Sequence, residues 1–317
     1  MIRIGIDVMG GDFAPVEPLK GCIEAKKQLA DIDIVLFGDE QSIIKHLSDL
    51  GHANHDFEIV HAPEVIGMGE HPTKAFSQKK NSSIGIGLHY LSKGLIDAFV
   101  GAGNTGAMMV GSIFTVKPIP GILRPTISSV LPKTTGGLGV LLDVGANADC
   151  KPDVLNQFAL LGSLFCQYVY KIENPRVALL NIGEEKEKGN LLAQAAHELM
   201  LDSKEYNFIG NCEGRDLFVD KVDVAVCDGF TGNVVLKACE SMYHILEARG
   251  IKDDFLDLFN YENYGGTPIL GINAPVIIGH GISNAPTFVA MLKLAAEMKE
   301  SGLIEKIKES LNLIKES

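Results

Sequence analysis

Residues 2–12 read Ile-Arg-Ile-Gly-Ile-Asp-Val-Met-Gly-Gly-Asp: a short apolar run at 2–8 is followed by a methionine, two glycines and an aspartate. A run of this length that closes on glycine is typical of a buried strand in a parallel sheet. Helical spacing follows at 16–29, then a second apolar run at 32–37 and another helical segment from Asp39. The chain therefore begins β-α-β-α, which is the order of a parallel sheet with right-handed crossovers.

The same alternation recurs along the rest of the chain. Further apolar runs, most with glycine at or soon after their ends, lie at 97–100, 176–181, 208–210, 222–227 and 275–278. Two runs at 126–131 and 138–143 are joined by Pro132-Lys-Thr-Thr-Gly-Gly137, which predicts an antiparallel hairpin. We expect an α/β fold: a doubly wound, mostly parallel sheet with helices on both faces. Because no repeat or linker interrupts residues 1–317, we expect one domain, whose sheet two lobes could share.

Composition limits the classes of function. The chain has 317 residues, of which 46% are hydrophobic and 21% charged, as in ordinary globular proteins. Its net charge of -12 repels nucleic acid and anionic lipid unless basic residues gather locally. No stretch resembles a signal peptide or reaches the roughly 18 apolar residues of a membrane span. We therefore expect a cytoplasmic protein without a nucleic-acid partner.

The six cysteines are scattered, without a Cys-x-x-Cys or a Cys/His ligand spacing. This pattern indicates neither a zinc site nor a disulfide framework. We expect reduced and mostly buried thiols, and no metal site.

Six loops at the predicted strand ends are rich in Gly, Asn and Asp. They lie at 7–12, 101–106, 143–147, 181–190, 228–233 and 279–284. Ligands of such sheets bind at the carboxyl ends of the strands, where glycine lets the backbone approach and peptide N–H groups bind anions such as phosphate. A single loop of this kind is more often a turn or a helix cap. Six of them predict an anion site.

Two better-known sites are disfavoured. Residues 101–106 match G-x-G-x-x-G, but the acid expected about 20 residues later is missing, since 111–139 contain no Asp or Glu. No P-loop motif occurs.

Ser283 lies in Gly281-Ile-Ser-Asn-Ala285, which resembles a nucleophile elbow without its last glycine, so we expect Ser283 to be a helix N-cap. His280 is the one histidine in a strand-end glycine loop and is a candidate for ligand contact.

Lysines supply the positive charge that a phosphate ligand needs in this acidic chain. Lys74, Lys79 and Lys80 cluster before a predicted helix that begins at Ile84. Lys151 follows an Asn-bearing loop, and Lys188 lies where a strand-end loop enters a helix. A solvated surface lysine is the alternative interpretation of each.

Seven ordered blocks of the sequence resemble the bacterial PlsX family of phosphate acyltransferases. The blocks are Ile4-Gly-Ile-Asp-Val-Met-Gly-Gly-Asp12, Ala102-Gly-Asn-Thr-Gly106, Asp143-Val-Gly-Ala-Asn147 with Cys150-Lys-Pro152, Leu180-Asn-Ile-Gly-Glu-Glu185, Glu213-Gly-Arg-Asp216, Cys227-Asp-Gly-Phe-Thr-Gly-Asn-Val-Val235 and Tyr264-Gly-Gly266 with Gly279-His-Gly281. The resemblance implies transfer of a fatty acyl group from acyl carrier protein to inorganic phosphate, which gives acyl phosphate for phospholipid synthesis. It also implies a homodimer without cofactor, metal or nucleotide, and a fold similar to isocitrate and isopropylmalate dehydrogenases and to phosphotransacetylases.

Two segments depart from the family pattern. Ser77 and Gln78 stand where the family usually carries arginines. The family's longer basic segment, associated with peripheral membrane attachment, is replaced by a short acidic one at 238–263. Weak peripheral membrane contact is therefore the most that we expect. The apolar residues of this segment could insert into a membrane, or pack at a dimer interface or against another part of the chain; they are Phe255, Leu256, Leu258 and Phe259.

This chemistry needs positioned donors rather than a catalytic triad. Phosphate is already an anionic nucleophile, and a thiolate with a pKa of about 8.5 is a good leaving group. The enzyme must hold the two reactants together and stabilise a tetrahedral oxyanion. We assign catalysis to Lys188, Asn147 and His280; phosphate or substrate binding to Gly103, Asn104, Thr105, Gly106, Gly145, Asn233 and Lys151; and carrier docking to Lys74, Lys79 and Lys80. Asp7, Asp143 and Asp228 are expected to brace the loops, because carboxylates facing phosphate would repel it.

Two other functions remain open. A transacylase that uses short acyl-CoA, like a phosphotransacetylase, would share the fold and the phosphate site. A non-catalytic module that binds the carrier protein or scaffolds at a membrane would keep the glycine loops for folding alone. The acyl donor and phosphate-dependent loss of the thioester distinguish the three.

Overall fold

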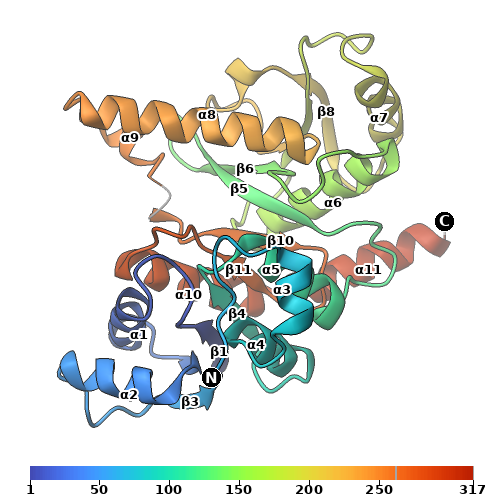
Figure 1. Ribbon diagram of the computed structural model, residues 1–317. Coiled ribbons are helices and arrows are strands. Elements are labelled where there is room, and N and C mark those ends of the chain that lie inside the picture. Colours follow the sequence, from blue (N-terminus) through green and yellow to red (C-terminus); the bar gives the residue numbers. More distant parts are fainter. Residues whose placement is uncertain (261–262, 317) are drawn as a thin grey trace. The chain divides into compact units, whose positions relative to one another are not determined.

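The computed structural model describes residues 1–260 and 263–316, with side chains up to residue 312 (Figure 1). The chain forms two compact units. Unit 1 comprises Met1–Lys117 and Tyr261–Glu300, and unit 2 comprises Pro118–Asn260 and Ser301–Ser317. Each unit has its own sheet segment and its own helices. The expected α/β architecture, a mostly parallel sheet flanked by helices, is confirmed.

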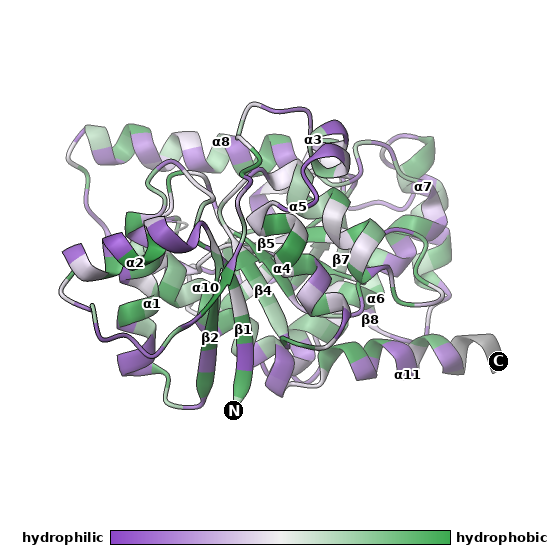
Figure 2. Ribbon diagram, turned by 60° about the horizontal axis from the view of Figure 1, so that its bottom comes forward, coloured by the Kyte–Doolittle hydropathy of each residue, from purple (hydrophilic) through white to green (hydrophobic). Residues whose placement is uncertain are grey.

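The strands of unit 1 follow the order β3-β2-β1-β4-β11-β10. All neighbours are parallel except the antiparallel pair β10 and β11. Figure 2 shows β2 and β4 as mainly hydrophobic, and their aromatic residues Phe37 and Phe99 are fully buried. The bounds are β1 Ile2–Asp7, β2 Ile32–Gly38, β3 Glu58–His61, β4 Ala98–Gly101, β10 Thr267–Leu270 and β11 Val276–Ile278.

Helices pack on both faces of this sheet (Figure 1). On one face, Gly87 of α4 lets that helix approach Phe99, and on the other Gly21 of α1 meets Phe288 of α10. Polar side chains start several of the helices: Asp39 caps α2, Ser82 caps α4 and Asn104 caps α5. The bounds are α1 Val16–Gln28, α2 Glu40–Asp49, α3 Pro72–Gln78, α4 Ser83–Ser92, α5 Thr105–Gly111, continued by a π-helical turn Ser112–Val116, and α10 Ala285–Glu300.

The strands of unit 2 follow the order β5-β6-β9-β7-β8. β5 and β6 pair antiparallel with Leu131 opposite Gly139, so the predicted hairpin is confirmed, and the other pairs are parallel. The bounds are β5 Thr126–Pro132, β6 Leu138–Leu142, β7 Arg176–Leu180, β8 Asn207–Cys212 and β9 Val224–Val226.

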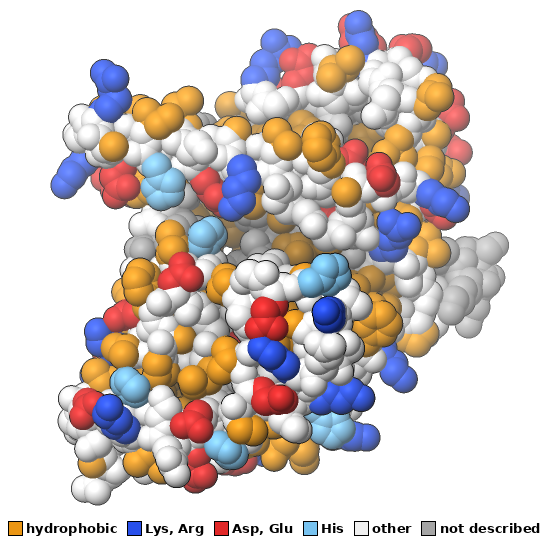
Figure 3. Space-filling view, viewed as in Figure 1, with side chains coloured by type: hydrophobic (Ala, Val, Ile, Leu, Met, Phe, Trp, Pro, Cys, Tyr) orange, Lys and Arg blue, Asp and Glu red, His pale blue; other side chains and the backbone are white. Residues whose placement is uncertain are grey.

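Helix α6 forms the centre of unit 2, since most of its residues are buried against the strands. Helix α8 is the opposite case: Gly229 and Gly232 are its buried residues, and hydrophobic side chains project along its length (Figure 3). In the segment after α8, Phe259 packs against Phe255 and Phe218 with ring centroids 5.4 and 5.1 Å apart. The bounds are α6 Pro152–Tyr168, α7 Leu191–Leu201, a 3-10 turn Gly214–Asp216, α8 Gly229–Ala248, α9 Asp254–Asp257 and α11 Leu303–Glu316.

Candidate active site

Three of the predicted glycine loops meet at one edge of unit 1. They follow β1, β4 and β11, which are neighbouring parallel strands whose carboxyl ends share that edge. The peptide N–H of Asp12 donates to the carbonyl of Gly281 at 2.7 Å, which joins the first loop to the third. The first and second loops touch at Gly10 and Gly103, where a Cβ on Gly10 would lie 2.7 Å from the backbone of Gly103.

Asp7 lies beneath this contact and is almost fully buried. Its carboxylate accepts a hydrogen bond from the N–H of Met9 at 3.0 Å and lies against both Gly10 and Gly103. Burial raises the pKa of Asp7 to about 6, and hydrogen bonds from Ser83 and the loop backbone only partly oppose that rise. Asp7 therefore holds two loops together from below, as a brace rather than as a ligand.

The Asn104 side chain is committed to the protein itself. Its Oδ1 accepts from the N–H of Ala107 at 2.9 Å. Its Nδ2 lies 3.0 to 3.1 Å from the carbonyls of Gly67, Met68 and Glu70. The amide thus fastens the 67–70 loop to the end of β4, and its hydrogens already have acceptors within the protein.

His280 and Ser283 occupy the loop between β11 and α10. His280 is exposed, and its Nδ1 lies 3.4 Å from the N–H of Ile282. The Ser283 hydroxyl donates to the His280 carbonyl at 2.6 Å. We predicted Ser283 as the N-cap of α10. The N-cap is instead Asn284, whose Oδ1 accepts from the N–H of Thr287 at 3.2 Å. The prediction was wrong by one residue, because α10 begins at Ala285 and the residue directly before it is Asn284.

In unit 2, Asp143 organises the loop after β6. Its buried carboxylate accepts from the N–H groups of Ile127, Ala146 and Asn147 and from the Asn147 amide, at 2.6 to 3.2 Å. The Asn147 amide also donates to the carbonyl of Pro125 at 2.9 Å. Both Asn147 amide hydrogens thereby have acceptors within the protein.

The first turn of α8 completes this cluster. Asn233 donates to the carbonyl of Val144 at 3.1 Å and lies against Gly145, so the structure brings Asn233 next to the loop that holds Gly145 and Asn147. A Cβ on Gly232 would lie 1.9 Å from the carbonyl oxygen of Asp143. Glycine is therefore required there for α8 to approach the β6 loop.

Lys188 lies in the loop between β7 and α7, and its side chain is exposed. Two ion pairs involve neighbouring charges: Glu184 pairs with Lys221 at 2.8 Å, and Lys186 lies 3.8 Å from Glu187. Among the residues whose side chains the structure describes, Lys188 has no ion-pair partner, nor does the exposed Lys151 before α6. Unit 2 therefore offers two lysines whose charge is available to an anion.

Comparison with known proteins gives the family. The model of the family described as "Fatty acid synthesis protein" matches residues 2–306. A phosphate acyltransferase of Desulforamulus reducens is 45% identical, with 98% of both chains covered. Phosphate acyltransferases of Dictyoglomus turgidum and Listeria innocua are each 41% identical, with 99% of this chain and 98% of theirs covered. The chain belongs to this family. The resemblance seen in the sequence blocks is confirmed.

Solved structures show the fold alone, because sequence identity to them is low. A phosphotransacetylase of Streptococcus pyogenes has a TM-score of 0.67 at 17% identity and 94% coverage of both chains. A branched-chain phosphotransacylase of Enterococcus faecalis has a TM-score of 0.65 at 15% identity, with 94% of this chain and 99% of that chain covered. A 4-hydroxythreonine-4-phosphate dehydrogenase of Burkholderia phymatum has a TM-score of 0.52 at 13% identity, with 94% of this chain and 98% of that chain covered. The expected likeness to phosphotransacetylases is confirmed, and that to isocitrate and isopropylmalate dehydrogenases stays a prediction.

The three lysines assigned to carrier docking differ in their surroundings. Lys74 on α3 and Lys80 after it are exposed. Lys79 instead pairs with Glu70 and donates to the carbonyl of Val65 at 2.8 Å. Lys79 therefore secures the 64–70 segment, and two charges of this cluster face solvent.

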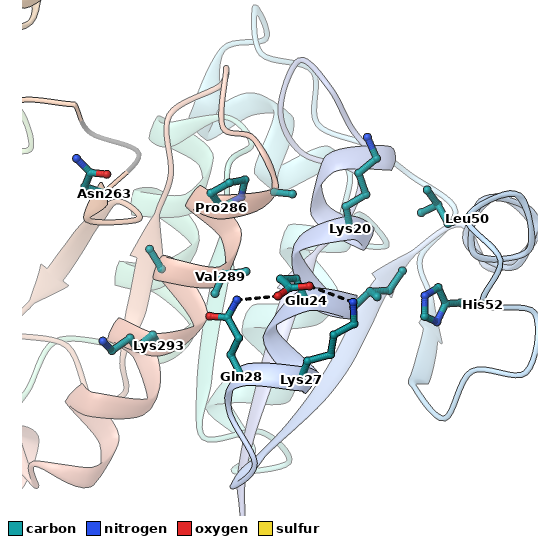
Figure 4. A pocket seen from close by; sticks show the side chains of 13 residues that line it. Lys20, Glu24, Lys27, Gln28, Leu50, His52, Asn263, Pro286, Val289 and Lys293 are labelled. Carbon is teal, nitrogen blue, oxygen red and sulfur yellow. Dashed lines mark hydrogen bonds and ion pairs between the residues drawn. The ribbon is translucent and has the colours of Figure 1, made fainter. Parts of the chain in front are cut away.

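One surface groove of unit 1 contains none of the predicted site residues. It has a volume of about 680 Å³ and runs beside α1 and α10 (Figure 4). Each lysine that lines it has an acid on its own helix: Lys20 lies 2.8 Å from Glu17, Lys27 3.1 Å from Glu24 and Lys293 3.9 Å from Glu297. The glycine loops, and not this groove, carry the candidate site.

Sequence reasoning missed the side chains that hold the 181–190 loop, namely Gln194, His197 and Asn211. None belongs to a recognisable motif. The available signal was the placement of polar residues on α7 and β8 next to a glycine-containing loop.

Proposed function

We propose that this chain transfers a fatty acyl group from an acyl carrier protein thioester to inorganic phosphate. Its membership of the family, with 40–45% identity to phosphate acyltransferases over nearly the whole chain, carries the proposal. The geometry supports it. Glycine loops follow the strands at one edge of each unit, and Lys188 has no ion-pair partner among the described side chains.

The reaction requires no group beyond the two substrates. A phosphate oxygen attacks the thioester carbonyl carbon, and the C–O bond forms as the carbonyl oxygen takes the negative charge. Collapse of that tetrahedral intermediate breaks the C–S bond, so the electron pair leaves with the carrier thiolate, which then takes a proton from water. Acyl phosphate and free carrier thiol are the products.

The protein's contribution is position and positive charge. In our proposal Lys188 neutralises the phosphate, with Lys151 adding to the local positive potential. In unit 1, the peptide N–H groups at Gly103, Thr105 and Gly106 are donors for phosphate or the oxyanion; in unit 2, the N–H of Gly145 is such a donor. Asn104 and Asn147 act through the loops that they fasten, because their amide hydrogens already have acceptors. His280 or Asn233 orients the thioester.

The test is direct. Purified protein is incubated with a long-chain acyl thioester of the carrier protein, with and without phosphate, and acyl phosphate is trapped with hydroxylamine. We expect thiol release and hydroxamate only when phosphate is present. Activity with acyl-CoA and none with the carrier thioester would favour the phosphotransacetylase-like alternative. Carrier binding without phosphate-dependent thioester loss would identify a non-catalytic module.

We further propose a homodimer, formed through α8, in the cytoplasm with at most weak membrane contact. Hydrophobic side chains at helical spacing lie on one face of α8 and are at least half exposed: Phe230 68%, Val234 53%, Met242 56% and Ile245 54%. An apolar stripe of this kind is normally covered by another helix. Among the described residues, no helix is both long enough and apolar enough to cross a bilayer. Equilibrium sedimentation, and flotation with vesicles, test the two claims.

A further inference from the structure

Three side-chain amides hold the backbone on both sides of Lys188. Asn211 of β8 donates to the carbonyl of Glu185 at 2.9 Å. Gln194 of α7 donates to the carbonyls of Glu187 at 2.8 Å and Gly189 at 3.2 Å. Asn181, at the end of β7, donates to the carbonyl of Lys188 itself at 3.1 Å. We call Asn181, Gln194 and Asn211 the amide clamp; all three belong to unit 2.

His197 sets the orientation of one clamp residue. Its Nδ1 lies 3.0 Å from Asn211 Oδ1, and the side chains of both residues are more than nine-tenths buried. The Asn211 NH₂ group must face the Glu185 carbonyl, because a carbonyl only accepts. Asn211 Oδ1 therefore faces the imidazole and also only accepts, so Nδ1 of His197 carries the proton. The ring is fixed in turn by Phe208, whose centroid lies 5.2 Å away edge-on.

Without the amide clamp, few buried contacts would hold the loop around Lys188 in this conformation. Its side chains from Glu184 to Lys188 are exposed, and three of those five are glutamates. Such loops are ordinarily mobile. Here the Lys188 N–H also donates to the Glu185 carbonyl at 3.0 Å, so the carbonyl that Asn211 holds is the one that fixes the Lys188 peptide. A chain of hydrogen bonds thus runs from His197 through Asn211 and Glu185 to Lys188.

We infer that His197 is a positioning residue for phosphate binding, acting through Asn211 on the Lys188 peptide. This inference rests on the proposed function, in which Lys188 neutralises phosphate. His197 does not touch the substrate. It fixes the Asn211 amide, and the amide fixes the turn from which the lysine side chain extends.

The test is His197→Phe, which keeps a ring against Phe208 and removes the N–H. We expect kcat/KM for phosphate to fall about three- to tenfold, the effect of losing one buried hydrogen bond. The fall should appear in the KM for phosphate, with the KM for the thioester unchanged. His197→Gln, whose amide can donate to Asn211, should recover most of the loss. Met200→Ala is the matched control, because Met200 is fully buried one turn further along α7 and takes no part in the clamp.

Two further measurements separate positioning from folding. In a Lys188→Ala background, His197→Phe should cause no additional loss of kcat/KM for phosphate, because the residue through which it acts is gone. Trypsin should cleave after Lys186 and Lys188 faster in His197→Phe than in wild type or Met200→Ala, because the turn is no longer held.

The outcomes are distinguishable. If Lys188→Ala impairs phosphate use and folded His197→Phe does not, the inference is overturned while the proposed function stands. Equal losses in Met200→Ala and His197→Phe would assign His197 to stability alone and overturn it too. If Lys188→Ala leaves kcat/KM for phosphate unchanged, the phosphate site of the proposed function is wrong. The positioning role of His197 is then wrong as well, even if faster trypsin cleavage in His197→Phe shows that the amide clamp holds the loop.

Discussion

Lys133, which follows the last residue of β5, forms an ion pair with Asp223, which lies 90 residues further along the chain and directly before β9. Both side chains are buried. Arg176, the first residue of β7, donates to the same carboxylate from its Nε at 2.9 Å and from its peptide N–H at 2.7 Å. One carboxylate therefore joins the ends of three strands of unit 2. Burial alone would raise its pKa, but the hydrogen bonds from Arg176 and Lys133 prevail and lower it to about 2.

Replacing Asp223 should destabilise the protein strongly. Asp223→Asn leaves the Lys133 ammonium buried with only Asp220, at 3.6 Å, as a carboxylate neighbour. Breaking a buried pair in this way costs about 3 to 5 kcal/mol of unfolding free energy. Asp220→Asn is the control, because Asp220 is largely exposed and its pairs are worth about 1 kcal/mol or less. Urea unfolding measures both, and equal small losses would contradict the prediction.

The depressed pKa of Asp223 also predicts that the protein loses stability in acid. Its pKa is depressed in the folded state, so its contribution to stability is present above the unfolded value of 3.8 and is lost as the pH falls towards 2. Wild-type unfolding free energy should therefore drop steeply over this interval. The drop should be shallower in Asp223→Asn.

Asp7 should make stability change with pH in the opposite direction. Its folded pKa of about 6 exceeds the unfolded 3.8, so the folded state binds the proton more tightly. Stability is then lost as the pH rises from about 4 to 6 and is constant above that. Asp7→Asn should remove this dependence and stabilise the protein at pH 7.5 by up to about 3 kcal/mol. The control is Asp12→Asn in the same loop, since Asp12 is exposed. A wild-type to Asp7→Asn difference that does not vary between pH 4 and 7 would refute the assignment.

Buried strands were predictable from the sequence because burial on both faces requires continuous apolar runs. The runs at 2–8, 32–37 and 97–100 became β1, β2 and β4 with bounds shifted by one residue or less. β3 and β10 were missed. Both lie at edges of the unit 1 order, β3 has no fully buried residue, and β10 begins Thr-Pro, so neither carries that signal.

The loops of the candidate site were predictable, but the use of their side chains was not. Glycine after a strand marks a loop whatever surrounds it. The acceptors of the Asn104 amide, in contrast, lie 34 to 37 residues away, and one acceptor of the Asn147 amide lies 22 residues away. Such partners are determined by tertiary packing, which composition and spacing do not report. The same holds for Lys79, whose partner Glu70 belongs to a different segment.

Lys188→Ala should impair the use of phosphate. A hydrogen bond to a charged group is worth about 1.5 to 3 kcal/mol, so kcat/KM for phosphate should fall roughly ten- to more than a hundredfold. The fold should survive because the side chain is exposed. Lys186→Ala in the same loop is the matched control, since Lys186 is also exposed and lies 3.8 Å from Glu187. Wild-type efficiency of Lys188→Ala at subsaturating phosphate would remove this loop from the anion site.

Cys150 should be dispensable for the reaction. It lies next to the β6 loop, with its Sγ 3.6 Å from the carbonyl of Asn147. Burial, with the charges of Asp143 and Asp228, raises its pKa to about 11, so little thiolate exists at neutral pH. Cys150→Ala should keep activity within about twofold of wild type. Loss of a catalytic group would lower activity more than about tenfold, which corresponds to about 1.4 kcal/mol. An acyl-cysteine detected by mass spectrometry after a thioester pulse would show that the thiol acts as a nucleophile.

Charge reversal at Lys74 and Lys80 should weaken recognition of the carrier protein and of nothing else. Both ammonium groups are exposed, and neither has an ion-pair partner among the side chains that the structure describes, so an acidic face of a carrier could meet them. Lys74→Glu with Lys80→Glu should raise the KM for the carrier thioester about tenfold at low salt and less at high salt, because screening weakens long-range attraction. The KM for phosphate should not change.

The groove beside α1 and α10 supplies the control for this last prediction. Lys27→Glu with Lys293→Glu changes the surface charge by the same amount, four units, at lysines that already have acids beside them. If net charge alone governs carrier association, the two double variants should lose affinity equally. A loss confined to Lys74 and Lys80 assigns docking to the surface of α3 and the residues after it, whereas a loss confined to Lys27 and Lys293 moves docking to the groove.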